Sequence, residues 1–142
     1  LRLAVVESGN YGEILSRAAA PKRDPARAAY LVVTYATHVS AAEYARYVLG
    51  YTVPQMQEWM AAGPLTAYAM FYNNTSFNTP WDSMLIMEYA DLAAFARRDE
   101  VKWAARAKLN ASDPAFKAYT DSKARIRDDR AMFHADAIPL PQ

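Results

Sequence analysis

The stretch "WDSMLIMEYADLAAF", residues 81–95, predicts a strand that passes directly into a helix. Its middle, "MLIM", is apolar, and successive side chains of a strand point to opposite faces of a sheet. Asp91 stands just before "LAAF", where its carboxylate can accept a hydrogen bond from an unpaired N–H of the first helical turn. We therefore expect a strand over 81–89 and a helix that begins immediately after Asp91.

The chain on the N-terminal side of this stretch predicts a strand, a long helix and a second strand. Residues 29–39, "AYLVVTYATHV", are rich in β-branched and aromatic residues, as strands are. Ser40 and Glu43 then form the S-x-x-E pattern of a helix N-terminus. We expect this helix to kink near Pro54 and to end at Gly63. The strand over 64–72 should form a hairpin with 81–89.

The C-terminal part predicts further helices and one last strand. A helix carries "EVKWAARAKL", residues 100–109, and another, opened by Ser112 and Pro114, carries "AFKAYTDSKARI", residues 115–126. The last strand is expected over 131–138, "AMFHADAI", before the prolines of "IPLPQ". The order of elements is β-α-β-β-α-β, which is that of a ferredoxin-like fold of the α+β class.

Residues 1–28 are expected to be an N-terminal extension and linker, followed by one α+β domain over 29–142. The extension could hold a short helix after Gly12 before the proline-punctuated segment "PKRDPAR", residues 21–27. Because the chain begins with Leu1 and not with Met, a signal peptide removed upstream is one explanation. We therefore leave the compartment open between the cytoplasm and export.

Composition narrows the classes of partner. The 142 residues and 15.9 kDa suit one domain, and no apolar run approaches the roughly 18 residues of a membrane span. The formal net charge of +1, with acids and bases interleaved as in "RIRDDR" at 125–130, argues against a nucleic-acid partner. The four glycines form no phosphate-binding loop and there is no cysteine, so neither nucleotide nor thiol chemistry is expected. We expect a soluble protein without an organic cofactor.

At the level of "WDSMLIMEYADLAAFARRDEV" (81–101) and "SDPAFKAYTD" (112–121), the chain resembles the dimeric α+β barrel superfamily. The resemblance spans about residues 29–138 and consists of elements and apolar spacings, without a catalytic signature. It implies an antiparallel sheet in the order 4-1-3-2 with helices on one face, the other face being covered by a second copy of the chain.

Alternation along the strands indicates which side chains face that second copy. In all four strands we expect the odd-numbered positions to face the helices. The even-numbered positions mix apolar residues such as Met70 and Ile86 with polar ones, so they should need a cover. A homodimer through the even face is the predicted assembly, and a small molecule in the enclosed space is the predicted ligand.

Three residues of the even face are candidates for catalysis: His38, Glu88 and His134. If the first and third strands run parallel and the fourth runs against them, these side chains converge. Two imidazoles and a carboxylate can transfer protons or, as an alternative, hold a metal ion, although we assign no metal. The competing interpretation is structural: Glu88 orients a Tyr or His, and His38 lies in an exposed turn.

A second group is expected at the opposite rim, where Tyr30, Tyr72, Asp82 and Asp136 should gather. The residues predicted to bind a ligand are Thr34, Tyr72, Trp81, Met84 and Asp136. By contrast, the helical stripe of Tyr44, Tyr47 and Tyr51 is expected to be core.

The predicted function is small-molecule binding, with enzymatic proton transfer or oxygenation as one possibility. A non-catalytic ligand-binding or assembly domain is the alternative. Haem binding is a further alternative, because some haem-degrading members of the superfamily frame haem with Asn, Trp and His. Asn78, Trp81 and His134 are the corresponding residue types here, without a matching spacing.

Overall fold

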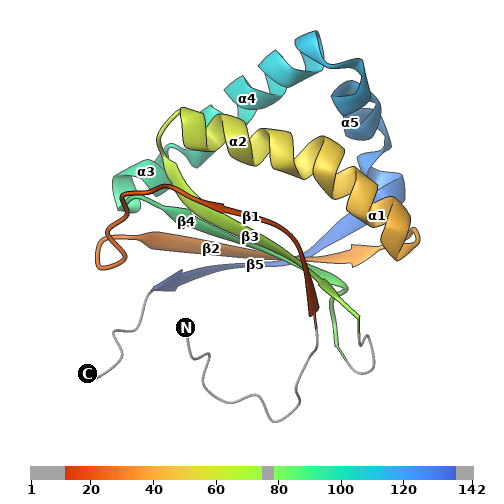
Figure 1. The fold of residues 1–142 in the computed structure, drawn as a ribbon, viewed down its shortest axis with the longest axis horizontal. Helices are drawn as coiled ribbons and strands as arrows, with labels where there is room; N and C mark the ends of the chain where they lie inside the picture. Colours follow the sequence, from red (N-terminus) through yellow and green to blue (C-terminus); the bar gives the residue numbers. More distant parts are fainter. Residues whose placement is uncertain (1–11, 75–78, 137–142) are drawn as a thin grey trace.

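The computed structural model describes residues 12–74 and 79–136. A single antiparallel sheet has all the helices on one face, and the other face carries no helix (Figure 1). The strands are β1 Gly12–Ala19, β2 Ala29–Thr37, β3 Leu65–Asn73, β4 Ser83–Tyr89 and β5 Arg127–Asp136. The helices are α1 Ala41–Tyr47, the π-helical turn η1 Val48–Thr52, α2 Val53–Ala61, α3 Leu92–Ala96, α4 Arg98–Ser112 and α5 Pro114–Ile126.

The sheet order is β1-β3-β4-β2-β5. Without β1, this is the predicted order 4-1-3-2 read from the other edge, so the ferredoxin-like α+β fold is confirmed. The expected helix after Gly12 is wrong, because Gly12–Ala19 is a strand that pairs antiparallel with β3. The N-terminal segment thus extends the sheet and takes the edge that β3 would otherwise occupy.

The helices begin where the sequence predicts caps. The Ser40 hydroxyl accepts a hydrogen bond from the Glu43 N–H at 3.2 Å, and the Asp91 carboxylate accepts one from Ala94 N–H at 2.8 Å. Asp113, one residue after the predicted Ser112, caps α5 through Ala115 N–H. The interruption expected near Pro54 is the π-helical turn η1, directly before α2.

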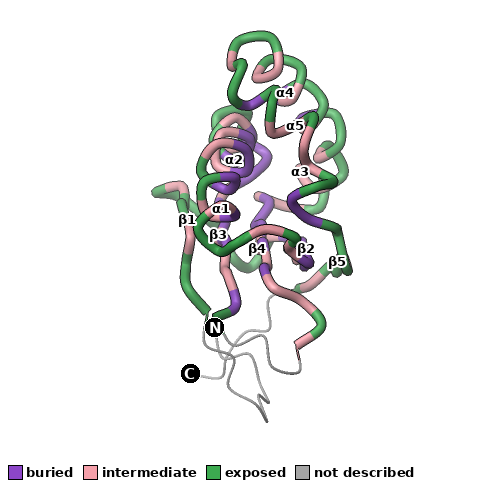
Figure 2. The backbone as a smooth tube through the Cα atoms, turned by 90° about the vertical axis from the view of Figure 1, so that its right-hand side faces the viewer, coloured by how far each residue is buried: buried purple, intermediate pink, exposed green. Residues whose placement is uncertain are grey.

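The core lies between the helices and one face of the sheet (Figure 2). Tyr44, Tyr47 and Tyr51 are fully buried there, as predicted, and their rings stack in series. The odd positions of β2 and β4 also point into this core, as predicted. No helix in the described part of the chain is long and apolar enough to cross a membrane.

The parity prediction is wrong for most of β3 and for the second half of β5. In β3 the register shifts between Leu65 and Ala67, so that Tyr68 and Met70 face the helices. In β5 the pairing with β2 shifts around Arg130, after which Met132 lies opposite Val33. One extra residue in a strand sends every following side chain to the other face.

We call the face without helices the open face. Its side chains are Ile14 and Arg17 of β1, Tyr30, Val32 and Thr34 of β2, Ala67, Ala69 and Phe71 of β3, Met84, Ile86 and Glu88 of β4, and Ala131, Phe133 and Ala135 of β5. It is mostly apolar, and its charged residues lie toward one end.

Candidate functional site

The three predicted catalytic residues do not converge. Glu88 pairs with Tyr30 near the start of β2, whereas His38 follows the end of that strand. Eight residues of strand separate these positions, or about 26 Å at the usual rise. The expectation failed because β2 and β4 run antiparallel, not parallel. His38 instead lies half-exposed, with its Nε2 atom 2.9 Å from Oδ2 of Asp128.

His134 lies near Glu88 along the sheet but on the other face. It pairs with Leu31, a core residue, and its ring contacts that of Phe95 in α3 at 5.0 Å. The register shift in β5 places it on the helix side. The described residues accordingly hold no group of three or more His, Asp or Glu side chains that could bind a metal ion.

The predicted ligand-binding residues are also dispersed. Thr34 and Met84 are paired on the open face, whereas Tyr72 contacts the ring of Tyr44 on the helix side. Asp136 is exposed near the end of the sheet where β2 begins. Trp81 lies at the opposite end, before β4.

The other members of these predicted groups are separated in the same way. Asp82 accepts a hydrogen bond from Thr37 N–H at the end of β2, far from Tyr30 at its start. Trp81 and His134 therefore do not frame a common haem site, since they lie at opposite ends of the sheet. Asn78 lies outside the described residues.

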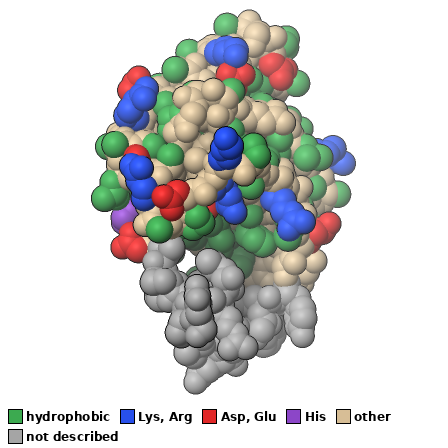
Figure 3. Space-filling model, turned by 60° about the vertical axis from the view of Figure 1, so that its left-hand side comes forward, with side chains coloured by type: hydrophobic (Ala, Val, Ile, Leu, Met, Phe, Trp, Pro, Cys, Tyr) green, Lys and Arg blue, Asp and Glu red, His purple; other side chains and the backbone are tan. Residues whose placement is uncertain are grey.

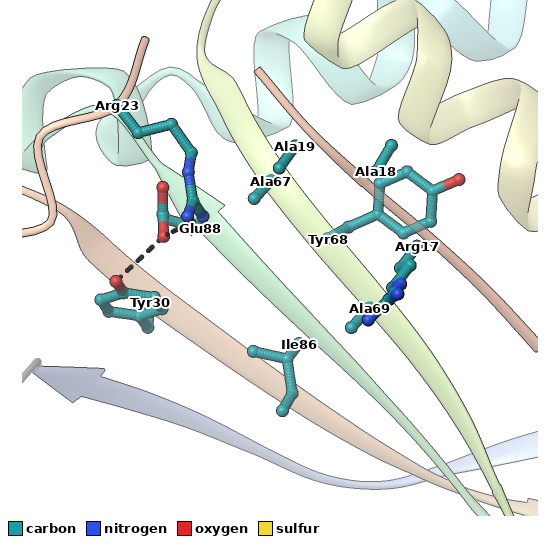
Figure 4. Close-up of a pocket in the computed structure, with 10 residues that line it drawn as sticks. All are labelled: Arg17, Ala18, Ala19, Arg23, Tyr30, Ala67, Tyr68, Ala69, Ile86 and Glu88. Carbon is teal, nitrogen blue, oxygen red and sulfur yellow. Dashed lines mark hydrogen bonds and ion pairs between the residues drawn. The ribbon is translucent and has the colours of Figure 1, made fainter. Parts of the chain in front are cut away.

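Glu88 instead organises a cavity on the open face (Figure 4). Its Oε2 atom accepts hydrogen bonds from the Tyr30 hydroxyl at 3.0 Å and from Arg23 Nη1 at 3.1 Å, and its Oε1 atom accepts one from the Thr66 hydroxyl at 2.8 Å. The cavity has a volume of about 460 Å³. Its lining comprises Arg17, Ala18, Ala19, Arg23, Tyr30, Ala67, Tyr68, Ala69, Ile86 and Glu88.

The buried carboxylate of Glu88 thus accepts hydrogen bonds from three residues, at least one at each oxygen. Burial, and then the hydrogen bond to Glu88, raise the pKa of Tyr30, so the phenol remains a donor. Arg23 belongs to the segment between β1 and β2, so Glu88 also anchors that segment to the sheet. The structural interpretation of Glu88, in which it orients a tyrosine, thus describes its contacts better than a His–Glu pair.

A second cavity, of about 170 Å³, lies between the sheet and the helices. We call it the helix-side cavity. Strands β2 and β4 supply its apolar floor, including Leu31, Val33 and Leu85. The turn η1 supplies Thr52, and α2 supplies Met56 and Trp59. Charged side chains from α4, α5 and β5 complete it: Arg98, Asp99, Lys102, Arg106, Lys123, Arg127 and Asp129.

Arg127 is the most buried of these charged residues, with 6% of its surface exposed. Its Cζ atom lies 3.7 Å from the ring centroid of Tyr35 and 5.3 Å from that of Tyr47. Burial acts to lower the pKa of Arg127, but the surrounding tyrosines, led by Tyr35, outweigh it and the pKa is raised. The guanidinium therefore stays charged inside the protein.

Several buried polar atoms around this cavity have no hydrogen-bond partner within residues 12–74 and 79–136. They are Nε and Nη1 of Arg127, the Thr52 hydroxyl and the Trp59 indole N–H. The Tyr44 hydroxyl, which is also buried, faces the same guanidinium. Buried polar groups are nearly always paired, so these atoms indicate a site for water or a ligand.

Sequence reasoning missed this cavity. The run "RIRDDR" resembles a solvated charged turn, and the predicted last strand begins four residues after Arg127. The available signal was Ile126, an apolar residue directly before Arg127 at the end of an amphipathic helix. That signal does not show that the following arginine starts a strand and points inward.

No protein-family profile and no curated protein sequence matches the chain. Its fold is similar to the crystal structure of HapK from Hahella chejuensis, with a TM-score of 0.50, 9% identity and coverage of 80% of this chain and 96% of that chain. A dabb family protein with a ferredoxin-like fold from Mesorhizobium loti has a TM-score of 0.43 and 18% identity, and the match covers 80% of this chain and 98% of that chain. A proposed monooxygenase of Lactobacillus acidophilus has a TM-score of 0.40 and 15% identity, and the match covers 80% of this chain and 47% of that chain. The likeness to HapK is one of fold, and it agrees with the ferredoxin-like order of the sheet.

Proposed function

We propose that this protein binds a small molecule in the helix-side cavity and forms a homodimer through its open face. The observation that carries the binding role is the set of buried polar atoms of Thr52, Trp59 and Arg127, which belong to the lining of this cavity and have no hydrogen-bond partner among the described residues. Leaving one such group unsatisfied costs about 1–3 kcal/mol. A bound molecule that supplies the missing partners would recover part of that cost.

The composition of the cavity supports an organic ligand over water alone. Its floor and one wall are aliphatic and aromatic, and its unpaired polar atoms are few and directional, as in small-molecule sites. Ordered water needs two to four polar partners, which the part of the cavity over Leu31, Val33 and Leu85 does not provide. The volume of about 170 Å³ is below the roughly 300–1,000 Å³ of drug-sized sites, so the ligand should be compact.

The proposed homodimer follows from the open face. Ile14 and Phe133 expose 46% and 54% of their surface on this face, and Val32, Met84 and Ile86 between them are only half-buried. Hydrophobic side chains also lie beside several Lys and Arg residues on the face shown in Figure 3. Apolar area gains about 25 cal/mol per Å² when it is removed from water, and a second sheet would supply the cover. Such pairing would also enclose the cavity around Glu88.

Binding, and not proton transfer by the predicted histidines, is the activity that we propose. His38, Glu88 and His134 lie at two ends and on two faces of the sheet, so they cannot act on one substrate atom. Neither histidine lines the helix-side cavity. Reaction chemistry, if the ligand undergoes any, would have to use the arginine, tyrosine and tryptophan side chains that surround it.

The test is a fragment screen read by methyl NMR, because neighbouring residues of one strand report on opposite faces. Val33 and Leu85 point toward the helix-side cavity, while Val32 and Ile86 point to the open face. A ligand of the proposed site should shift the Val33 and Leu85 methyl signals in a saturable way and leave those of Val32 and Ile86 nearly unchanged. Shifts confined to Val32 and Ile86 would move the binding role to the cavity around Glu88.

A further inference from the structure

We infer that the helix-side cavity selects a small organic carboxylate, with the carboxylate held by Arg127 and the apolar part of the molecule on the sheet. This inference deepens the proposed binding function and depends on it. It rests on three properties of the cavity: the kind of polar atom left unpaired, the balance of charge, and the nature of the floor.

The unpaired atoms are mostly donors. The Trp59 indole N–H and the two Arg127 nitrogens can only donate hydrogen bonds, and the Thr52 hydroxyl can donate or accept. Thr52 and Trp59 are 2% and 6% exposed, so bulk water does not satisfy them. A ligand that matches this set must therefore offer acceptor oxygens close together. A carboxylate has two oxygens with about four acceptor positions.

The charge of the cavity favours an anion. Its lining holds five cationic side chains and two carboxylates, which gives a net charge of +3. Asp99 is engaged by Lys102 Nζ at 2.7 Å and by Arg98 Nη2 at 3.6 Å, and Asp129 lies 3.7 Å from Lys123 Nζ.

Arg127 itself has no carboxylate partner among the described residues. A buried charge without a counterion is destabilising, even with aromatic rings beside it. The remaining cation of the lining, Arg106, donates a hydrogen bond from Nε to the amide oxygen of Gln55 at 2.7 Å, and no described carboxylate forms an ion pair with it. An anion next to Arg127 would therefore meet an excess of positive charge.

The apolar floor of the cavity suits an organic anion better than an inorganic one. Leu31, Val33, Leu85 and Met87 offer no polar side-chain atom, and Tyr35 and Tyr89 present rings to the same space. Burial raises the pKa of Tyr35 to about 12, so this phenol is neutral at physiological pH and does not repel an anion. An apolar body of one short chain or one ring would cover this floor while the carboxylate meets Arg127.

The experiment compares matched pairs that differ only in charge. Benzoate with benzamide, and hexanoate with hexanamide, are titrated into the full chain by calorimetry and by NMR, with inorganic phosphate as an anion without an apolar body. The indole N–H signal of Trp59, assigned with Trp59→Phe, reports hydrogen bonding inside the cavity. At least one carboxylate should bind ten-fold or more tightly than its amide and shift this signal, and phosphate should not.

A variant and its matched control test whether Arg127 is the residue that binds the carboxylate. Arg127→Met should weaken the best carboxylate ten-fold or more and leave its amide within two-fold. Arg130→Met, three residues along the same strand and exposed, is the matched control and should change neither. If Arg127→Met does not fold, Thr52→Val tests the same site through a hydroxyl of nearly equal volume, with an expected loss of two- to five-fold for the carboxylate.

The outcomes separate this inference from the proposed function. Equal binding of carboxylates and amides, both with shifts of Trp59, would overturn the anion preference and leave the binding function standing. No saturable shift of Trp59 or of the Val33 and Leu85 methyl groups with any probe would overturn both. Carboxylate binding that survives Arg127→Met would assign the anion to a different cation and also overturn the inference.

Discussion

The guanidinium of Arg127 lies over the ring of Tyr35, with 3.7 Å between its Cζ atom and the ring centroid. This contact holds a cation in the interior without a carboxylate beside it. Cation–π attraction in a desolvated place contributes about 2 kcal/mol, which is less than the several kcal/mol that burying a charge costs. By this balance Arg127 lowers the stability of the fold unless an anion binds beside it, as we propose.

The first prediction is that Arg127→Met does not lower stability. Methionine fills a similar apolar volume without a charge to desolvate, so the free energy of unfolding in urea should stay within about 1 kcal/mol of the wild type or rise. Arg130→Met serves as the exposed control. A loss greater than about 3 kcal/mol would show that Arg127 is fully compensated in the ligand-free protein, since that is the usual cost of breaking a buried ion pair.

The second prediction concerns the open face. Sedimentation at micromolar concentration should show a particle of about twice the 15.9 kDa chain. Ile86→Lys places a charge in the middle of the open face, between Val32 and Ala69, and should shift the particle to the monomer. Leu92→Lys alters an apolar residue of α3 that is already 64% exposed, and should leave the dimer intact. A wild-type protein that sediments as a monomer would contradict the proposed homodimer.

The third prediction separates the charge of Glu88 from its hydrogen bonds. Glu88→Ala removes the partner of Tyr30, Arg23 and Thr66 and should cost about 1–3 kcal/mol in chemical unfolding. Glu88→Gln keeps oxygen and nitrogen atoms at the same place and should cost less than about 1 kcal/mol, because the ion pair that it loses is with a partly exposed arginine.

A second measurement follows the segment that Glu88 anchors. Amide hydrogen exchange around Arg23 should become faster in both Glu88 variants, because this segment then loses its ion pair to the sheet. The matched control is Arg27→Gln, which breaks an exposed contact of the same segment with Asp91 and should change stability by no more than about 0.5 kcal/mol. Unchanged exchange at Arg23 in Glu88→Ala would mean that other contacts hold the segment.

The fourth prediction is a loss of stability in alkali. Burial raises the pKa of Tyr35 to about 12 and also raises those of Tyr44, Tyr47 and Tyr89, whereas an unfolded tyrosine titrates near 10. Between these values the unfolded chain binds fewer protons than the folded one, so stability is full below about pH 10 and falls as the pH rises toward 12. Each such tyrosine removes about 1.4 kcal/mol per pH unit.

This loss can be followed by tyrosinate absorbance together with circular dichroism. The two signals should change together, because the buried phenols ionise only when the core opens. Tyr35→Phe should shift the transition to higher pH. Ionisation of all ten tyrosines near pH 10 with the fold intact would contradict the burial of this group.

Much of the fold could be predicted from local sequence. Ser40 and Asp91 cap helices because a side-chain oxygen next to a helix start needs no distant partner. The odd positions of β2 and β4 face the core as alternation predicts. Glu88 is buried at the end of an apolar strand, where a charged residue must find partners, but its partners are Tyr30, Arg23 and Thr66 and not the predicted histidines.

The faces of β3 and β5, and with β5 the candidate site, could not be predicted, because they depend on two register shifts and on strand direction. The irregularity between Leu65 and Ala67 turns Tyr68 and Met70 inward. The one around Arg130 places Arg127 and Met132 on the same face although they are five residues apart. Strand alternation has a period of two, so a single unpaired residue reverses the face of all that follow it, and nothing in the local composition marks where that residue lies.

The sequence by itself determined the order of elements, the helix caps and the α+β class, because these follow from hydrogen bonds and apolar spacing within a few residues of each other. Only the tertiary structure decided which polar residues meet. It joined Gly12–Ala19 to the sheet, moved His134 to the helix side and enclosed Arg127 between Tyr35 and Tyr47. Those contacts connect residues far apart in the chain, and they exist only once antiparallel pairing has set the direction and register of every strand.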